Sequence, residues 1–135
     1  MDERVIRQLV EKAIEMTNFS YAPYSNFTVG AALLTDEGEI YTGCNIENAA
    51  YGPSNCAERT AVFKAVSEGK KNFKAIAVVG GLNKKIEDYC SPCGVCRQVL
   101  AEFCDKDFKV IMAKSLDDIK ILTLGDLLPE SFSLK

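Results

Sequence analysis

The N-terminal segment carries apolar side chains at the three- and four-residue spacing of a helix. Between residues 3 and 18 one stripe contains Val5, Ile6, Leu9, Val10, Ala13 and Ile14, with charged residues on the opposite side. This pattern predicts an amphipathic helix. Residues 18–26 follow as a turn-rich loop that contains Pro23.

Strand-like and helical patterns alternate along the rest of the chain. The apolar run 27–34 favours a strand, Asp36-Glu37-Gly38 is typical of a tight turn, and residues 39–45 supply the partner strand. Residues 47–55, rich in glycine, proline, asparagine and serine, predict a loop. The remaining predicted elements are a helix from 56 to near 69, a strand at 75–80, a loop at 82–91, a helix at 93–103, strands at 108–113 and 119–122, and a helical turn at 125–128.

The order of these elements predicts an α/β fold. Strands that alternate with helices build a sheet with helices packed on its faces, and the run 75–80 is apolar throughout, as in a strand covered on both faces. We therefore expect a three-layer α-β-α sandwich around a mixed five-stranded sheet. The 135 residues contain no repeat, low-complexity tract or linker, which predicts a single domain over 1–135.

The charge balance argues against a polynucleotide partner. The net charge is −3 with both signs interspersed, whereas proteins that hold phosphate backbones usually carry a basic stripe. A small, nearly neutral ligand fits this balance better. No apolar run approaches the roughly 20 residues of a membrane helix, and Met1-Asp2-Glu3-Arg4 lacks the layout of a secretory signal. We expect a cytoplasmic protein with neither a membrane nor a nucleic acid as partner.

The chain has six cysteines and no histidine, so any transition-metal site must be rich in thiolates. In a reducing compartment, metal binding or catalysis by such cysteines is favoured over disulfides. A lone Cys-x-x-Cys is ambiguous between a redox pair, half a zinc finger and chance, but Cys93 and Cys96 are joined here by Cys56, which starts another predicted helix. Three protein ligands are typical of catalytic zinc, whereas structural zinc takes four.

The sequence leaves a fourth ligand open. Cys44 and Cys104 fall within a predicted strand and late in a predicted helix, and are interpreted as small buried hydrophobic residues. Cys90 precedes Ser91-Pro92 and is near enough in the chain to bind the same ion. A fourth thiolate at Cys90 would make the site a closed, structural one.

Two charged residues follow Cys56 in the first turn of its predicted helix. Glu58 can reach an open coordination position without binding the metal, which is where a residue that moves protons between water and substrate must lie. Arg59 can donate N–H groups to the ligand sulfurs and offset their charge, as can the helix N-termini. An acidic residue in a first turn more often compensates the helix dipole, but its place beside a metal ligand favours catalysis.

The motifs Cys56-Ala57-Glu58 and Pro92-Cys93-Gly94-Val95-Cys96 resemble the signature of the zinc nucleoside and nucleobase deaminases, whose glutamate is the general acid and base. Cysteine rather than histidine at position 56 is similar to the cytidine deaminases of free nucleosides. The stretches 24–32, 43–49, 56–60 and 91–98 resemble the same family. The chain length is similar to that of its short form, which is a homotetramer with one zinc ion per subunit.

The resemblance implies roles for further residues. Asn45 and Glu47 would hydrogen-bond the ribose hydroxyls, Phe27 would pack on the pyrimidine ring, and backbone groups of Ala57 would contact the base. Tyr51 and Phe132 resemble residues that close the pocket across a subunit interface. The implied reaction is the hydrolysis of cytidine and deoxycytidine to uridine and deoxyuridine plus ammonia, as in pyrimidine salvage.

Two other functions are compatible with the sequence. One is deamination of another aminopyrimidine, such as free cytosine, a nucleotide or blasticidin S, although Asn45 and Glu47 favour a free ribose and no basic phosphate site is evident. The other is a non-catalytic structural zinc domain in which Cys90 is the fourth ligand. The sequence does not rank cytidine against deoxycytidine.

Overall fold

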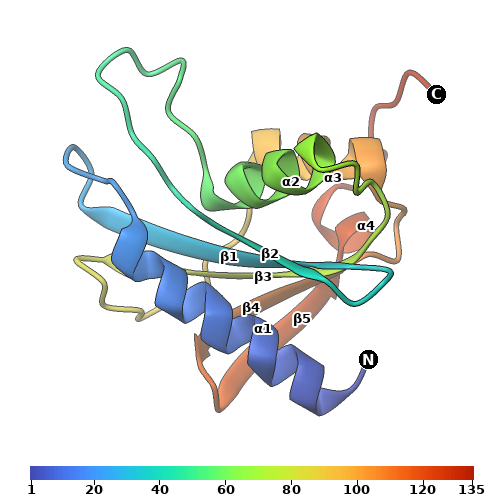
Figure 1. Cartoon of the computed structure of the whole chain (residues 1–135), viewed down its shortest axis with the longest axis horizontal. Coiled ribbons are helices and arrows are strands. Elements are labelled where there is room, and N and C mark those ends of the chain that lie inside the picture. Colours follow the sequence, from blue (N-terminus) through green and yellow to red (C-terminus); the bar gives the residue numbers. More distant parts are fainter.

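The computed structural model describes residues 1–135 and contains a five-stranded sheet with helices on both faces (Figure 1). The predicted elements are all present, with ends that differ from prediction by one or two residues. None of the helices combines the length and the apolar character needed to span a bilayer. In chain order the elements are α1 (Glu3–Met16), the 3₁₀ helix η1 (Thr17–Phe19), β1 (Phe27–Thr35), β2 (Ile40–Cys44), α2 (Ala57–Ser67), β3 (Phe73–Leu82), α3 (Gly94–Phe103), β4 (Lys109–Ser115), β5 (Asp118–Thr123) and α4 (Leu124–Leu127).

The first helix is shorter than its apolar stripe predicted. The pattern indicated a helix to residue 18, but α1 ends at Met16 and the chain tightens into η1. The hydroxyl of Thr17 donates a hydrogen bond to the Ile14 carbonyl at 2.6 Å. This side-chain bond competes with continuation of the α-helical ladder.

The strands lie in the order β2-β1-β3-β4-β5. Strand β1 pairs antiparallel with both β2 and β3, β3 pairs parallel with β4, and β4 pairs antiparallel with β5. The prediction of a mixed five-stranded sheet is therefore confirmed.

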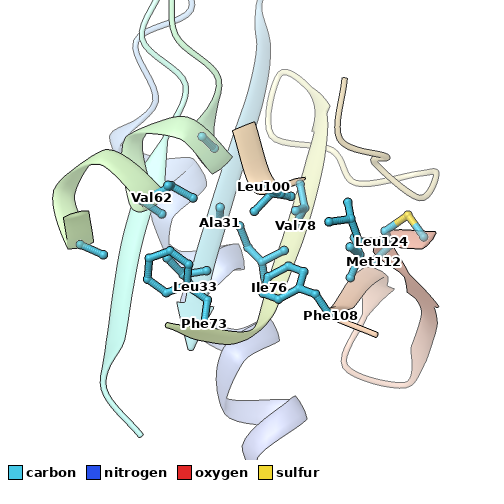
Figure 2. Close-up of a cluster of buried hydrophobic side chains, with 14 residues drawn as sticks. Ala31, Leu33, Val62, Phe73, Ile76, Val78, Leu100, Phe108, Met112 and Leu124 are labelled. Atoms are coloured by element: carbon cyan, nitrogen blue, oxygen red, sulfur yellow. The ribbon is translucent and has the colours of Figure 1, made fainter. Parts of the chain in front are cut away.

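Alternate side chains of the central strands pack into two separate cores. On one face, Ala32 and Leu34 of β1 pack with Leu9 and Val10 of α1. On the other face, Leu33 and its neighbours in the sheet pack against α2 and α3, as Figure 2 shows for the cluster around Leu33, Ile76 and Leu100. Because both faces are covered, the strands are apolar throughout and the molecule is the predicted three-layer sandwich.

One edge of the sheet brings together the segments that carry the candidate site. Since β2 and β3 are both antiparallel to β1, their C-terminal ends lie at the same edge as the first residue of β1, Phe27. Residues 45–56 lead from β2 into α2, and residues 83–93 lead from β3 into α3 (Figure 1). Ligands of open α/β sheets bind beyond the carboxyl ends of strands, which is where both helices begin.

Candidate metal centre and active site

The thiol groups of Cys56, Cys93 and Cys96 lie together where α2 and α3 begin. Their three sulfur atoms all lie within 4.8 Å of one another, and the Cys56 and Cys93 sulfurs are 3.6 Å apart. Zinc–sulfur bonds of about 2.3 Å at tetrahedral angles separate two ligand sulfurs by about 3.8 Å. The trio therefore fits a tetrahedral zinc ion in both ligand type and spacing.

Cys56 and Cys93 are the N-caps of their helices. The sequence predicted helices that begin at these residues, but both have extended backbones, and the helices start at Ala57 and Gly94. The Cys93 side chain caps α3, because Cys93 Sγ accepts the Cys96 N–H at 3.4 Å, whereas the Cys56 side chain makes no such bond to the first turn of α2. Both positions favour the thiolate over the thiol.

The charge of the thiolates is partly offset by Arg59. Its Nη2 donates to Cys56 Sγ at 3.2 Å, while its Nε is buried without a hydrogen-bond partner in the protein. A hydrogen bond from Cys96 lowers the pKa of the Cys56 thiol to about 5, with Arg59 and Cys93 adding to the effect. The same bond raises the pKa of Cys96.

Glu58 lies in the first turn of α2 with its side chain turned inward. The residue is only 4% exposed, and burial raises the pKa of its carboxyl to about 7. Its carboxyl borders the same cavity as the Cys56 and Cys93 sulfurs. A carboxyl group in this state can take up or release a proton near neutral pH.

A cavity of about 310 Å³ opens beside the sulfur cluster. Its walls include Cys56, Cys93 and Glu58 together with Asn45 and Glu47, which come from the end of β2 and the loop after it. One cavity is thus lined by residues that the sequence assigned to three roles: metal binding, proton transfer and ribose binding. The cavity is large enough for a nucleoside-sized ligand.

The Asn45 amide is held in a defined orientation by the backbone of β1. Its Oδ1 accepts from the Val29 N–H at 2.9 Å and from the Ser20 hydroxyl, and its Nδ2 donates to the Phe27 carbonyl at 2.8 Å. A flipped amide would place Nδ2 against the Val29 N–H and Oδ1 against the Phe27 carbonyl. The hydrogen bonds therefore determine which atom is Oδ1 and which is Nδ2. Because Oδ1 already has two donors, Asn45 can offer a ligand its second Nδ2 proton but no acceptor.

The Glu47 carboxylate is anchored to the turn that precedes β1. Its Oε1 accepts the backbone N–H groups of Tyr24 and Ser25 at 3.0 and 3.1 Å, and its Oε2 accepts the hydroxyl of Ser25. These bonds, the hydroxyl of Ser25 foremost, lower the pKa of Glu47, so the group is an acceptor at neutral pH. Asn45 and Glu47 therefore present one donor and one acceptor to the same cavity.

The other residues predicted to contact the substrate do not line the cavity beside the sulfur cluster. Phe27 lines a neighbouring hollow of about 380 Å³, and Cys90 borders both spaces. Ala57 is fully buried in the first turn of α2 and lines neither space. Tyr51 and Phe132 are 83% and 66% exposed and line neither space.

The other three cysteines lie outside the sulfur cluster. Cys44 is buried at the end of β2, and Cys104 follows α3 and packs against the core. Cys90 packs beside Gly80, where an added Cβ would lie 3.0 Å from its sulfur, and burial raises the pKa of Cys90 to about 12. The geometry favours three sulfur ligands over a closed site with four.

Sequence reasoning missed the serines that orient the two polar residues. Ser20 binds Asn45 across 25 positions of chain, and Ser25 binds Glu47 across 22. No periodicity or motif relates positions so far apart. Two signals were available: the cluster of turn-forming residues before β1, which predicted a loop, and the resemblance of the stretch 24–32 to the deaminase family, which includes Ser25. Neither indicated what the serines contact.

Comparison with known proteins gives a consistent result. A family model described as the cytidine and deoxycytidylate deaminase zinc-binding region matches residues 3–112. The chain is 49% identical to a cytidine deaminase of Sporosarcina psychrophila over 128 residues, which cover 95% of this chain and 91% of the relative. It is 48% identical to a cytidine deaminase of Halalkalibacterium halodurans over 127 residues, covering 94% and 93%.

Solved structures match over similar lengths. The crystal structure of cytidine deaminase from Burkholderia pseudomallei superposes with a TM-score of 0.84 at 46% identity, covering 93% of this chain and 97% of that one. The cytidine deaminase structure from Mycobacterium tuberculosis gives a TM-score of 0.80 at 38% identity, covering 94% and 96%.

Proposed function

Because the chain belongs to the cytidine and deoxycytidylate deaminase family, we propose that it hydrolyses cytidine and deoxycytidine to uridine and deoxyuridine. Water supplies the new C4 oxygen, and the exocyclic amine leaves as ammonia. The observation that carries the proposal is the shared cavity. Cys56 and Cys93 of the thiol trio, the buried Glu58 carboxyl and the Asn45–Glu47 pair all border one space of nucleoside size, and Cys96 lies behind it within 4.8 Å of the other two sulfurs.

In this proposal Cys56, Cys93 and Cys96 hold one zinc ion per subunit. A zinc ion with three protein ligands supplies Lewis acidity that lowers the pKa of a coordinated water molecule to about 7. Arg59 and the N-termini of α2 and α3 reduce the negative charge of the sulfurs, which preserves that acidity.

Glu58 is assigned the proton transfers. Its carboxylate takes a proton from the attacking water and delivers it to N3 of the cytosine ring, so that C4 becomes electrophilic as the C–O bond forms. It then passes the second proton to the departing amine, and the C4–N bond breaks to give ammonia and uridine. The burial of Glu58 excludes bulk water that would otherwise compete for these protons.

Asn45 and Glu47 are assigned to the sugar. A ribose hydroxyl that accepts from Asn45 Nδ2 and donates to Glu47 satisfies both side chains at once. A ligand without that hydroxyl leaves two polar groups unpaired, which is the basis of strong discrimination. Phe27 would pack on the pyrimidine ring, and backbone groups of Ala57 would contact the base.

Tyr51 and Phe132 are assigned to a neighbouring subunit's site. Both rings are exposed and lie outside the cavity of their own chain, as expected of residues that act across an interface in a homotetramer. None of the six cysteines is in a disulfide, which supports a reducing, cytoplasmic location. The proposed reaction would serve pyrimidine salvage.

A substrate panel with and without a chelator tests the proposal. Loss of ultraviolet absorbance would be followed for cytidine, deoxycytidine, cytosine and CMP. We expect turnover of both nucleosides, rates for cytosine at least about 10²-fold lower because Asn45 and Glu47 lose their partner, and little turnover of CMP. A zinc chelator should abolish the activity and added zinc should restore it. Zinc-loaded protein that converts neither nucleoside contradicts the proposal.

A further inference from the structure

The hydroxyl of Ser25 connects two parts of the candidate ribose and base site. Its Oγ donates to Glu47 Oε2 and accepts from the Phe27 N–H at 3.0 Å. Ser25 therefore bonds at once to the carboxylate assigned to the ribose and to the first residue of β1, whose ring borders the adjoining hollow.

The hydrogen bond from Ser25 fixes the orientation of the Glu47 carboxylate. Two backbone N–H groups already hold Oε1, but a carboxylate anchored through one oxygen can still swing about that anchor. The hydroxyl holds the second oxygen and so fixes the carboxylate plane, while leaving Oε2 free to accept one more hydrogen bond. A ligand hydroxyl can take that place without displacing any of the existing donors.

We infer that Ser25 is a positioning residue for sugar recognition, because it holds the second oxygen of Glu47 in the orientation that accepts a ribose hydroxyl. This inference rests on the proposed function. It predicts an effect on substrate binding rather than on proton transfer, since Ser25 contacts Glu47 and is not among the residues that line the cavity beside Cys56, Cys93 and Glu58.

A purely structural role for Ser25 in its turn can be distinguished from a role in sugar recognition. Its bond from Phe27 N–H is a local turn bond of the same kind as the one from Asp117 N–H to Ser115 Oγ, at 3.2 Å, in the turn between β4 and β5. Ser115 makes the local bond without any link to the cavity. Ser115→Ala is therefore a matched control for Ser25→Ala.

The experiment is steady-state kinetics on cytidine for Ser25→Ala, Ser25→Thr and Ser115→Ala. We expect Ser25→Ala to raise KM about tenfold with kcat within about twofold, as befits one lost bond to a charged group. Ser25→Thr keeps the hydroxyl and should restore KM, and Ser115→Ala should match the unaltered protein. In a Glu47→Gln background the additional effect of Ser25→Ala should shrink to less than about twofold.

Three results would overturn the inference. These are an unchanged KM in Ser25→Ala, an equal change in Ser115→Ala, or a full tenfold effect of Ser25→Ala in the Glu47→Gln background. Failure of the proposed function is recognised separately, because the unaltered, zinc-loaded protein would then not deaminate cytidine at all.

Discussion

In the proposed mechanism, single residues divide the chemistry: three thiolates would hold the metal and Glu58 would move the protons. Three thiolates and a zinc dication carry a formal charge of −1, and the cationic Arg59, which donates to Cys56 Sγ at 3.2 Å, brings the group close to neutral. Thiolates bound to zinc and a guanidinium that stays protonated are poor proton carriers near neutral pH. Glu58, buried beside the cluster and bordering the cavity, is placed to carry protons to a substrate.

Glu58→Gln tests this division directly. Glutamine keeps the size of the side chain but cannot carry the proton, so we expect kcat to fall about 10²- to 10⁴-fold. Zinc content should stay at one ion per chain, because Glu58 is not a ligand. Both quantities would be measured on one preparation, by ultraviolet absorbance and atomic absorption.

Glu68→Gln is the matched control, since Glu68 lies exposed at the other end of α2 and its carboxylate accepts only from the Tyr41 hydroxyl. It should retain full turnover. Near-normal kcat in Glu58→Gln, or loss of its zinc, would refute the assigned role.

Each half of the metal motif was predictable from sequence because its spacing is local, and the two halves, 37 positions apart, were related by the resemblance to the deaminase signature. Cys56 and Glu58 share one helical turn, as do Cys93 and Cys96, so the motif itself places their side chains. The hydrogen bonds that orient Asn45 and Glu47 were not predictable. They depend on the approach of the turn before β1 to the end of β2, which only the folded sheet determines.

At the scale of elements, two glycines set how closely the helices approach the sheet. A Cβ on Gly43 of β2 would lie 2.4 Å from the Ala57 carbonyl oxygen and 2.7 Å from the Ala61 nitrogen, in α2. A Cβ on Gly30 of β1 would lie 1.9 Å from the Ala13 carbonyl oxygen, in α1. Alanine at either position would push a strand backbone away from a helix backbone. Of the two helices, only α2 carries residues of the candidate metal site.

Gly43→Ala should therefore weaken both the fold and the metal site. We expect a loss of about 1–3 kcal/mol in the free energy of unfolding, together with a zinc affinity at least about tenfold lower, because the start of α2 moves away from Cys93 and Cys96. Denaturant unfolding gives the first quantity, and competition with a chromogenic chelator gives the second.

Gly30→Ala separates the two effects. It should destabilise the fold at least as much while leaving the zinc affinity of the folded protein unchanged, because α1 lies on the opposite face of the sheet. Equal zinc affinities for the two variants would show that the approach of α2 to β2 does not hold the site together.

The order and type of the elements followed from hydrophobic period, but their ends did not. Helices predicted from Cys56 and Cys93 begin one residue later, and this shift turns both cysteines into N-caps. Periodicity cannot find a cap, because a cap is defined by its extended backbone rather than by its place in the apolar stripe.

For the whole molecule, Tyr51 combines an unusual backbone conformation with an aromatic ring that its own chain leaves exposed. Its backbone has a φ of 58°, a conformation that bulky residues rarely adopt, and hydrogen bonds to Asn48 and Ser54 hold it there. The ring is 83% exposed. The proposed role of Tyr51 in a neighbour's site would cover this ring.

Mixing two impaired variants tests this role. If Tyr51 completes a neighbour's site, Glu58→Gln and Tyr51→Ala chains that are each impaired alone should recover activity when unfolded and refolded together. Random assembly leaves about a quarter of the sites with an intact Glu58 and a neighbour's intact Tyr51. Sedimentation should give the mass of four chains.

No recovery in the mixture would assign Tyr51 to its own chain, and sedimentation at the mass of one chain would remove the basis for the interface roles of Tyr51 and Phe132. The three-layer sandwich was predictable because it follows from which residues must be buried. The assembly was not, because exposed rings such as Phe132 resemble any other exposed apolar residue in a pattern.

Three sulfur ligands would leave zinc one coordination position for water near Glu58. X-ray absorption at the zinc edge of the purified protein counts the sulfur and oxygen neighbours of the ion. We expect three sulfur neighbours at about 2.3 Å and one oxygen at about 2.0 Å. Four sulfur neighbours and no oxygen, with Cys90 as the additional ligand, would refute the three-thiolate site.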